Sequence, residues 1–434
     1  MTLLAHGVGS RTDLPIPLGL ALYGAGAAIL ISFAALLLFW RTPKLGGPDA
    51  GRPLPQAVQR IADSGAVRRA LQGVALALSV LVVAATIGGP PETARNLGPW
   101  ALYVTFWVGL VPASLLLGPV WRVVNPLRLL HALAGSVLRT SPGVHRLPAL
   151  GLWPAAVSLL VFLWFELVYP GRAEPTTVAA FLVGYAVVQT GLALWFGEDW
   201  FARGDGFEVY STLVARLSPW ARRSDGRLVV RSPLTNAVST PELPGLAAVV
   251  VVLLGSTAFD GISRTAWWQT GPGSAEDALS GTIALLASIA LVGGLYLLGT
   301  RLSGRLAGRP GAIQPRRYAA TVIPIALGYT VAHYFSLLAL DGQTTWILLS
   351  NPFGLSGVDL FGTYDNVVDL TAVSPDTIAY VQVGGVIAGH VAGVTLAHER
   401  ALRTERHARA SDQLPLVVVM VLFTIGGLGL LFGF

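Results

Sequence analysis

Three ionisable side chains lie inside long apolar segments of this sequence: Glu166, Asp260 and His333. Imidazole and carboxylate groups together can ligate a divalent metal such as zinc or copper, and a bound metal brings water toward deprotonation near neutral pH. The same groups can instead relay protons, with His333 exchanging a proton with either carboxylate. The residue types therefore predict either a metal-assisted hydrolytic site or a proton-relay site.

Helical spacing groups these residues with polar neighbours. One stripe consists of Tyr329, His333 and Ser336, and a second consists of Ser256, Asp260 and Ser263. Arg264 follows Asp260 by four residues and can pair with it on the same helix face. Each stripe predicts a polar face on an otherwise apolar helix.

The amino-acid composition indicates whether these polar helix faces belong to a soluble protein or to a membrane protein. The chain has 434 residues, 53% of them hydrophobic and only 12% charged, whereas a soluble domain has about 25% charged residues. A helix needs about 20 apolar residues to cross a bilayer, which predicts an all-α polytopic bundle of about ten transmembrane helices in one membrane domain, residues 1–434. The ten segments lie near residues 18–40, 70–89, 98–118, 149–169, 177–196, 244–263, 279–299, 318–340, 375–397 and 414–433.

Basic residues orient the predicted helices. All Lys and Arg except Arg11, Arg95, Arg172 and Arg264 lie in the alternate connections 41–69, 119–148, 197–243, 300–317 and 399–413. Because positively charged connections stay inside, both termini are expected outside, and the chain is expected to be a multi-pass protein of the plasma membrane. The net charge of +6 is spread over these loops, so the predicted partner is the lipid bilayer and not nucleic acid. The absence of cysteine excludes disulfides and thiolate ligands.

Helix direction and rise place the three candidates at one depth. Measured from the inner face, Glu166 lies at about 25 Å, Asp260 at about 24 Å and His333 at about 22 Å. We therefore expect them to form one site in the outer third of the bilayer, with Glu166, Asp260 and His333 as catalytic residues or metal ligands.

Further histidines and a glycine stripe are weaker candidates. His390 is expected about 9 Å from the inner surface, mainly as a hydrogen-bonded packing residue, and His6 would reach the site only by folding back over it. His398 is expected to be solvated at the inner end of its helix. Gly385, Gly389 and Gly393 recur every four residues, which predicts a close contact with a partner helix.

Three segments outside the spans have distinct compositions. Residues 197–243 are expected to form a small cytoplasmic cap with an amphipathic helix near 209–217. The segment "GPVWRVVNPLRLLHAL" is expected at the head-group level, with Trp121, Arg122 and Arg128 as anchors. Residues 341–374 contain four aspartates and no Lys or Arg, and are expected to form an outer re-entrant or lid-like loop.

Four segments, "AHGVGSRTDLPIPLGLALYG", "LLLGPVWRVVNPLR", "AHYFSLLALDGQ" and "GHVAGVTLAHERAL", extend along nearly the whole chain. In these segments the sequence resembles a family of polytopic bacterial membrane proteins often labelled fenitrothion hydrolase. The resemblance implies hydrolysis of an aryl organophosphorothioate ester, and so of an apolar, lipid-soluble small molecule. It implies no particular catalytic residues.

Two other functions remain open from the residues. A proton- or metal-ion-handling transporter would use the same outer residues and would also need polar groups in the inner half, for which His390, Gln189 and Tyr185 are available. A non-catalytic membrane subunit would need only the glycine stripe and the outer loop.

Overall fold

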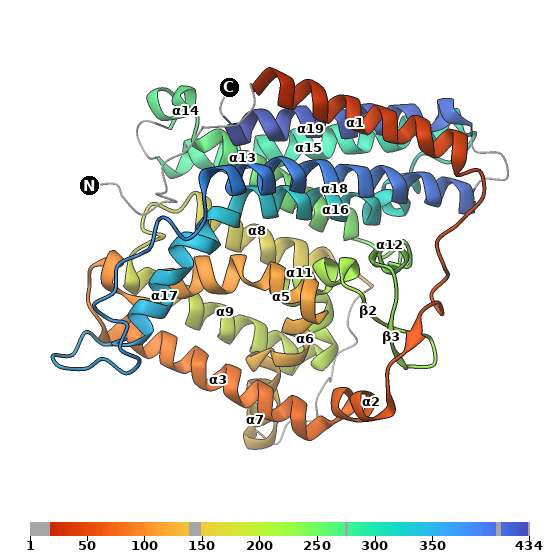
Figure 1. The fold of residues 1–434 in the computed structure, drawn as a ribbon. Helices are drawn as coiled ribbons and strands as arrows, with labels where there is room; N and C mark the ends of the chain where they lie inside the picture. Colours follow the sequence, from red (N-terminus) through yellow and green to blue (C-terminus); the bar gives the residue numbers. More distant parts are fainter. Residues whose placement is uncertain (1–17, 139–148, 274–276, 405–408, 433–434) are drawn as a thin grey trace.

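A computed structural model of the chain describes residues 18–138, 149–273, 277–404 and 409–432 (Figure 1). Within these residues, nine helices are long and apolar enough to cross a membrane, and a tenth apolar helix, Trp153–Leu167, is shorter. The three strands together contain only a few residues. The predicted all-α polytopic bundle is confirmed, and the chain is a multi-pass membrane protein.

In the described residues, the bundle consists of the nine segments that can cross a membrane and the shorter apolar helix α8, and we call these ten elements crossings. The crossings are α1 (Leu18–Phe39), α3 (Gly65–Gly88), α4–η2–α5 (Leu97–Pro99, Trp100–Val108 and Leu110–Leu117), α8 (Trp153–Leu167), α9 (Pro175–Phe196), α13 (Leu246–Ser263), α15 (Ala278–Leu306), α16 (Gln314–Ser336), α18 (Pro375–Thr404) and α19 (Ala410–Phe432). Shorter helices lie between them: α2 (Gln56–Asp63), η1 (Thr93–Arg95), α6 (Val120–Val124), α7 (Pro126–Leu138), η3 (Glu198–Trp200), α10 (Phe201–Gly204), α11 (Gly206–Val214), η4 (Ala215–Leu217), α12 (Pro233–Val238) and α14 (Ala266–Thr270). Two more, η5 (Leu337–Asp341) and α17 (Gly342–Leu349), continue α16.

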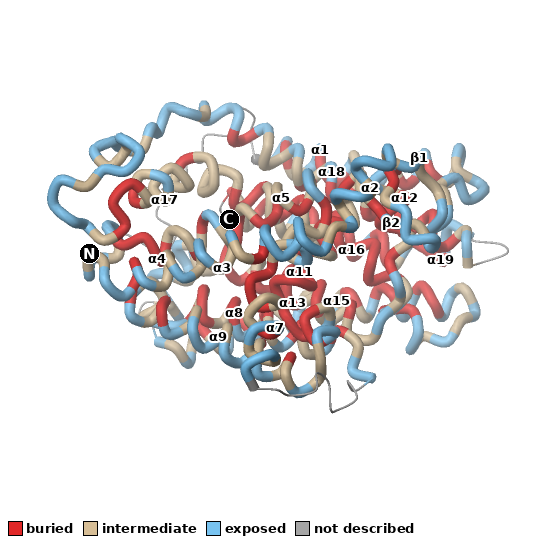
Figure 2. Tube along the Cα trace, turned by 90° about the horizontal axis from the view of Figure 1, so that it is seen from below, coloured by how far each residue is buried: buried red, intermediate tan, exposed pale blue. Residues whose placement is uncertain are grey.

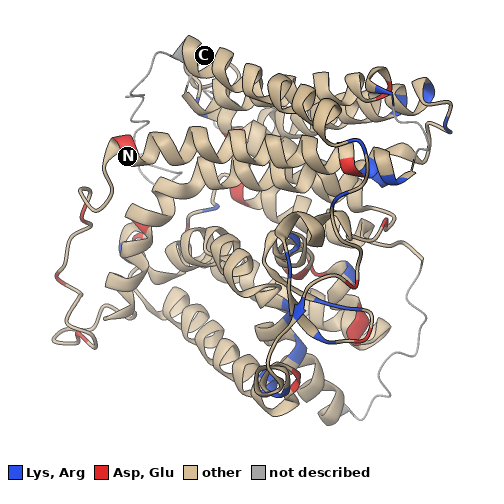
Figure 3. Cartoon of the chain, turned by 45° about the vertical axis from the view of Figure 1, so that its right-hand side comes forward, with Lys and Arg blue, Asp and Glu red and all other residues tan. Residues whose placement is uncertain are grey.

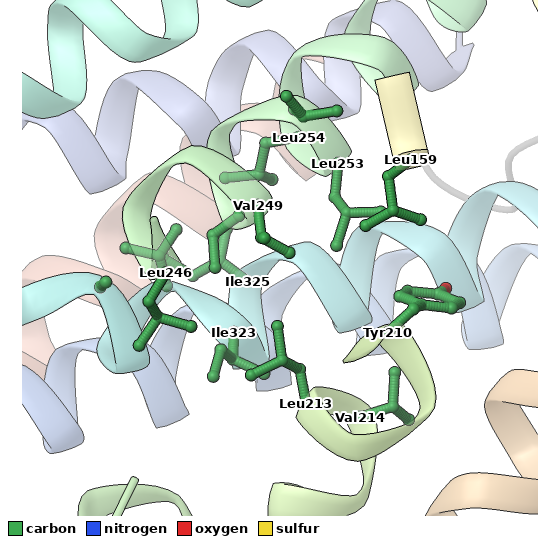
Figure 4. Packing of buried hydrophobic residues seen from close by; sticks show 14 of the residues in the cluster. Leu159, Tyr210, Leu213, Val214, Leu246, Val249, Leu253, Leu254, Ile323 and Ile325 are labelled. Carbon is green, nitrogen blue, oxygen red and sulfur yellow. The ribbon is translucent and has the colours of Figure 1, made fainter. Parts of the chain in front are cut away.

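Two groups of crossings share one apolar core. In Figure 1, α1 lies with α13, α15, α16, α18 and α19, while α3, α5, α8 and α9 lie on the other side. Helices α8 and α13 pack together between the groups. Figure 4 shows side chains of α11, α13 and α16 meeting in this core, among them Leu213, Leu253 and Ile323. The buried residues in Figure 2 follow the same central elements.

Helix α11 differs from the expected amphipathic cap. All its residues except Thr212 are buried, and it packs against α5, α6, α8 and α16. Gly206 permits this placement because a Cβ at that position would lie 2.9 Å from the side chain of Leu159. The expected helix near 209–217 is thus present as α11, but it is buried in the bundle and is not the exposed amphipathic helix that was expected.

Charge and strands mark the end of the bundle opposite to the outer loop. Helix α1 begins and α19 ends at the same end of the molecule (Figure 1), whereas Figure 3 shows Lys and Arg concentrated near the other end. Here a small antiparallel sheet of order β1-β3-β2 joins Arg52–Pro53, Leu228–Val230 and Trp220–Arg222. By the positive-inside rule, we expect this end on the inner side of the membrane.

Two predicted spans have different limits in the structure. The fourth begins only at Trp153, because residues 149–152 form a turn in which Gly151 has φ 60° and Leu152 N–H donates to Pro244 O (2.7 Å). The eighth does not end near residue 340, since α16 continues through η5 and α17 as one helical segment, Gln314–Leu349. The irregular part of the outer loop is thus residues 350–374.

The glycine stripe of α18 packs on α16 of the same chain. A Cβ on Gly389 would lie 2.5 Å from Pro324 O, and one on Gly393 would lie 2.9 Å from Thr321 O. A Cβ on Gly328 of α16 would in turn overlap Gly385 O. The predicted close helix contact is confirmed, and its partner is an internal helix.

We expect Gly389→Ala to destabilise the fold by about 1–3 kcal/mol, because the added methyl group overlaps the α16 backbone. Gly384→Ala is the matched control on the same helix, because nothing lies within 4 Å of its added Cβ. Thermal unfolding of both variants in detergent measures the difference. Equal midpoints for the two variants would contradict a tight α16–α18 contact.

Candidate functional site

Asp260 and His333 meet inside the bundle, as their depths predict. Asp260 lies on α13 and His333 on α16, and both residues are at most 5% exposed. The distance between His333 Nε2 and Asp260 Oδ2 is 2.6 Å. The two residues are 73 positions apart in the sequence, so the packing of α13 on α16 creates the pair.

Two further side chains approach the same carboxylate oxygen. The Tyr334 hydroxyl donates to Asp260 Oδ2 (3.0 Å), and Arg264 Nη2 lies 3.4 Å from it. The side chain of Arg264 is 39% exposed, which makes it the polar link from this centre toward the outer end of α13. Tyr329 stacks on the His333 ring at a centroid distance of 5.8 Å. Because several polar groups surround one buried carboxylate, its charge is stabilised where hydrocarbon alone would not support it.

Glu166 lies near this centre on α8. It is 2% exposed, and it interacts electrostatically with Asp260, Arg172 and Arg264. Its Oε2 atom and the Nδ1 atom of His333 have no hydrogen-bond partner among the described residues. We call Glu166, Asp260, His333 and Tyr334 the outer centre. Both unpartnered atoms are available to a proton, a water molecule or a ligand.

The distance between His333 and Asp260 is short for two ligands of one metal ion. Two ligands of a tetrahedral zinc ion lie about 3.3 Å apart, since each is about 2.05 Å from the metal. His333 Nε2 and Asp260 Oδ2, at 2.6 Å, are at hydrogen-bond distance, so a metal at this pair would have to replace that bond. In the described part of the chain, no group of three or more His, Asp or Glu residues is placed to hold a metal ion.

The other candidate histidines have different outcomes. His390 lies at the middle of α18, because the helix continues to Thr404 and not to residue 397 as expected. Its Nδ1 faces Val386 O at 2.9 Å, as expected of a packing residue, and its Nε2 has no partner among the described residues. His398 is not solvated: it is buried, with its ring nitrogens 2.9 Å from Gln413 Oε1 and 2.8 Å from Trp40 O. His6 falls outside the described residues.

A second buried polar cluster, absent from the sequence expectations, surrounds the N-terminus of α11. Asn125 Nδ2 donates to Asp205 Oδ2 (2.8 Å) and to Glu208 Oε2 (3.1 Å). Arg128 donates to both oxygens of Glu208, through Nε (2.9 Å) and Nη2 (2.6 Å), and its Nη1 donates to Glu198. Asp205 and Glu208 are completely buried. Arg128 is therefore the partner of a buried carboxylate, a role that the expected head-group anchor does not include.

Two residues of α9 extend this cluster. The Tyr185 hydroxyl donates to Asp205 Oδ1 (2.7 Å), and the Gln189 amide donates to Ser158 Oγ (3.2 Å). Ser158 Oγ in turn lies 3.2 Å from the Tyr185 hydroxyl. We call Asn125, Arg128, Tyr185, Gln189, Asp205 and Glu208 the inner cluster. The sequence signal was the apolar pattern of "GDGFEVYSTLVARL", which is too apolar for a solvated loop.

Stability should depend on pH through Asp205, which lies outside the spanning helices. Burial, reinforced by the negative charge of Glu208, raises the pKa of the Asp205 carboxyl group from 3.8 to about 6, although hydrogen bonds from Tyr185 and Asn125 oppose this. The folded state then holds a proton that the unfolded chain releases, so the contribution of Asp205 to the free energy of unfolding falls as pH rises from about 4 to about 6.

The expected decrease is at most about 3 kcal/mol. It is measured as the difference between the unfolding free energies of the wild type and Asp205→Asn across this pH range, with Asp277→Asn at an exposed helix N-terminus as control. A constant difference would show that Asp205 does not titrate in this range.

Comparison with protein-family models, with curated proteins and with solved structures found no match to this chain.

Proposed function

We propose that this protein is a proton-handling membrane transporter, with the outer centre as its proton-binding site. The observation that carries the proposal is the 2.6 Å contact between Asp260 and His333 inside a membrane bundle. Ionisable residues within membrane helices are costly and usually serve ion or proton pathways. A carboxylate and an imidazole in direct contact can exchange a proton without any change of backbone conformation.

The inner cluster supports transport over a function confined to the outer leaflet. Transport requires polar groups in the inner half, and Gln189 and Tyr185 belong to the cluster around Asp205. Between the two sites, α11 carries Tyr210, which interacts electrostatically with Glu166, and Ser211, whose hydroxyl lies 2.8 Å from that of Ser114. Polar side chains on α11 thus add to those of the outer centre and the inner cluster.

The test uses purified protein in liposomes that contain a pH-sensitive dye. A potassium gradient with valinomycin sets the membrane potential, and the internal pH is recorded. We expect proton movement above that of protein-free liposomes. Identical traces with and without protein would contradict the proposal.

We also propose that the protein is located in the plasma membrane. Fractionation of cell membranes would test this location.

A hydrolase is the second candidate, and one observation favours it. Asp260 holds one ring nitrogen of His333 while Nδ1 has no partner among the described residues. A carboxylate that orients an imidazole and leaves its other nitrogen available is the arrangement of a general base. Together with the resemblance to the fenitrothion hydrolase family, it supports hydrolysis of a lipid-soluble phosphoester or organophosphorus ester.

If the hydrolase depends on a metal ion, the purified protein should contain that metal. We expect stoichiometric zinc or copper in the purified wild type if His333 and Asp260 are ligands, and its loss in His333→Ala and Asp260→Ala. Elemental analysis of the three proteins decides this, with release of the aryl alcohol from a phosphorothioate triester as the parallel activity assay. The same low metal content in all three would exclude these residues as metal ligands.

A further inference from the structure

The outer loop and α3 together form an apolar groove. Its volume is about 260 Å³. It is lined by Leu78 and Leu81 of α3 and by residues 349, 351–353, 355, 358, 360 and 361. The one polar side chain of the lining is Asn351, whose amide nitrogen donates to Leu355 O and whose amide oxygen accepts from Leu355 N–H (both 2.8 Å). The groove thus offers only hydrocarbon contacts.

The positions of Leu78 and Leu81 on α3 indicate how deep the groove lies in the bilayer. Helix α3 runs from Gly65 at the inner side to Gly88 at the outer side. Leu81 and Leu78 therefore lie about 10 and 15 Å below its outer end, by the rise of a helix. Half of the hydrocarbon core is about 15 Å thick, so the groove extends into the outer leaflet. Loop residues that line it with Leu78 lie beside acyl chains.

The groove is continuous with the lipid-facing surface of α3. Leu78 is 53% exposed, and the buried residues of this helix are only Gln72, Ala85 and Thr86. On the loop side, Leu355 and Leu360 are 57% and 66% exposed. Both walls therefore present apolar side chains to the surface that the bilayer covers.

The loop backbone is suited to a place without water. Leu360 N–H donates to Ser350 O (2.8 Å), Phe361 N–H to Ser350 Oγ (3.2 Å) and Val358 N–H to Leu355 O (3.3 Å). Irregular backbone at membrane depth is tolerated only where protein covers it, and here the loop lies against α3 across the groove. Phe361 also stacks on Trp346 at a centroid distance of 5.3 Å, which keeps the apolar side of the loop together.

We propose that the apolar side of residues 350–361, which lines the groove, enters the outer leaflet and holds one acyl chain of a membrane lipid against Leu78 and Leu81. The occupant is an acyl chain because the groove has no available polar group and opens on the lipid-facing side of a spanning helix. Asp359, Asp365 and Asp369 are exposed residues of the same loop, and none of them lines the groove, so they mark the aqueous side of the loop.

The depth of the loop can be measured directly, because the chain has no cysteine. Leu360→Cys and Asp365→Cys are spin-labelled in phosphatidylcholine liposomes, and collision with oxygen is compared with collision with a water-soluble nickel chelate. We expect a several-fold higher ratio of oxygen to nickel collisions at residue 360 than at 365. Equal ratios would overturn the membrane placement.

Occupancy is tested on the wild-type protein with phosphatidylcholine that carries a diazirine in its acyl chain. Cross-links should be enriched at residues 78–81 and 349–361 over Val187, a lipid-facing residue of α9 that is 66% exposed. Val358→Trp, which fills the groove, should remove the enrichment. Cross-linking that is no higher than at Val187 would overturn the proposal.

Discussion

Replacing Asp260 with asparagine is expected to reduce proton movement about 100-fold, the usual order of effect when a proton-transfer group is lost. Asparagine has nearly the same size and can still hydrogen-bond to His333 and Tyr334, but it cannot accept a proton. The measurement is the initial rate of internal acidification in proteoliposomes at a fixed membrane potential. The physical cause is specific, because Asp260 Oδ2 is the atom that His333, Tyr334 and Arg264 all approach.

Two controls separate this effect from a loss of folding. Asp277→Asn changes an exposed aspartate at the N-terminus of α15, where asparagine caps a helix equally well, so transport should be unchanged. Glu166→Gln removes the other carboxyl group of the outer centre and should also slow transport. If Asp260→Asn keeps wild-type rates while its unfolding temperature is unchanged, Asp260 is not the proton-binding residue.

Replacing Arg128 with alanine is expected to destabilise the protein by about 3–5 kcal/mol, because removal of one partner leaves a buried charge uncompensated. Arg128 contacts both oxygens of Glu208, a residue with no exposed surface. After its removal, Asn125 is the remaining hydrogen-bond donor that contacts the Glu208 carboxylate in the described structure. Chemical or thermal unfolding in detergent gives the change in free energy.

The matched control is Arg227→Ala. Arg227 pairs with Asp225 at 3.6 Å on the surface, where both side chains are about half or more exposed, so the expected cost is below about 1 kcal/mol. Arg128→Ala combined with Glu208→Gln should recover part of the lost stability, since no buried charge is then left without its partner. Similar losses for Arg128→Ala and Arg227→Ala would show that the Glu208 contact is not a buried ion pair.

The membrane fold could be predicted from the sequence, because it depends on local patterns of apolar and basic residues. Each span is a continuous apolar run, and the alternation of basic connections gives a second, independent signal for the number of crossings. Even so, α8 is shorter than its apolar run, because the contact of Leu152 with Pro244 forms a turn before it. The limits of a helix depend on such neighbours, and α18 likewise continues to Thr404 although its last turns are charged.

The depth of the candidate site residues in the bilayer could be predicted from the sequence, but the direction in which their side chains point could not. Equal rise along α13 and α16 placed Asp260 and His333 at one level, and their 2.6 Å contact confirms that they face each other. No such arithmetic applied to His398, whose neighbours in sequence are charged but whose contacts are Trp40, directly after α1, and Gln413 of α19.

The sequence by itself determined that this chain is an all-α, multi-pass membrane protein, which connections are basic, and which few ionisable residues lie inside its apolar segments. These properties depend on hydrophobicity and helix rise, which are local. Only the tertiary structure decided that Asp260 contacts His333, and that α11 lies inside the bundle with Asp205 and Glu208 buried beside Arg128. Those facts depend on how helices rotate and pack, and a helix with apolar residues all round carries little information about which face turns inward.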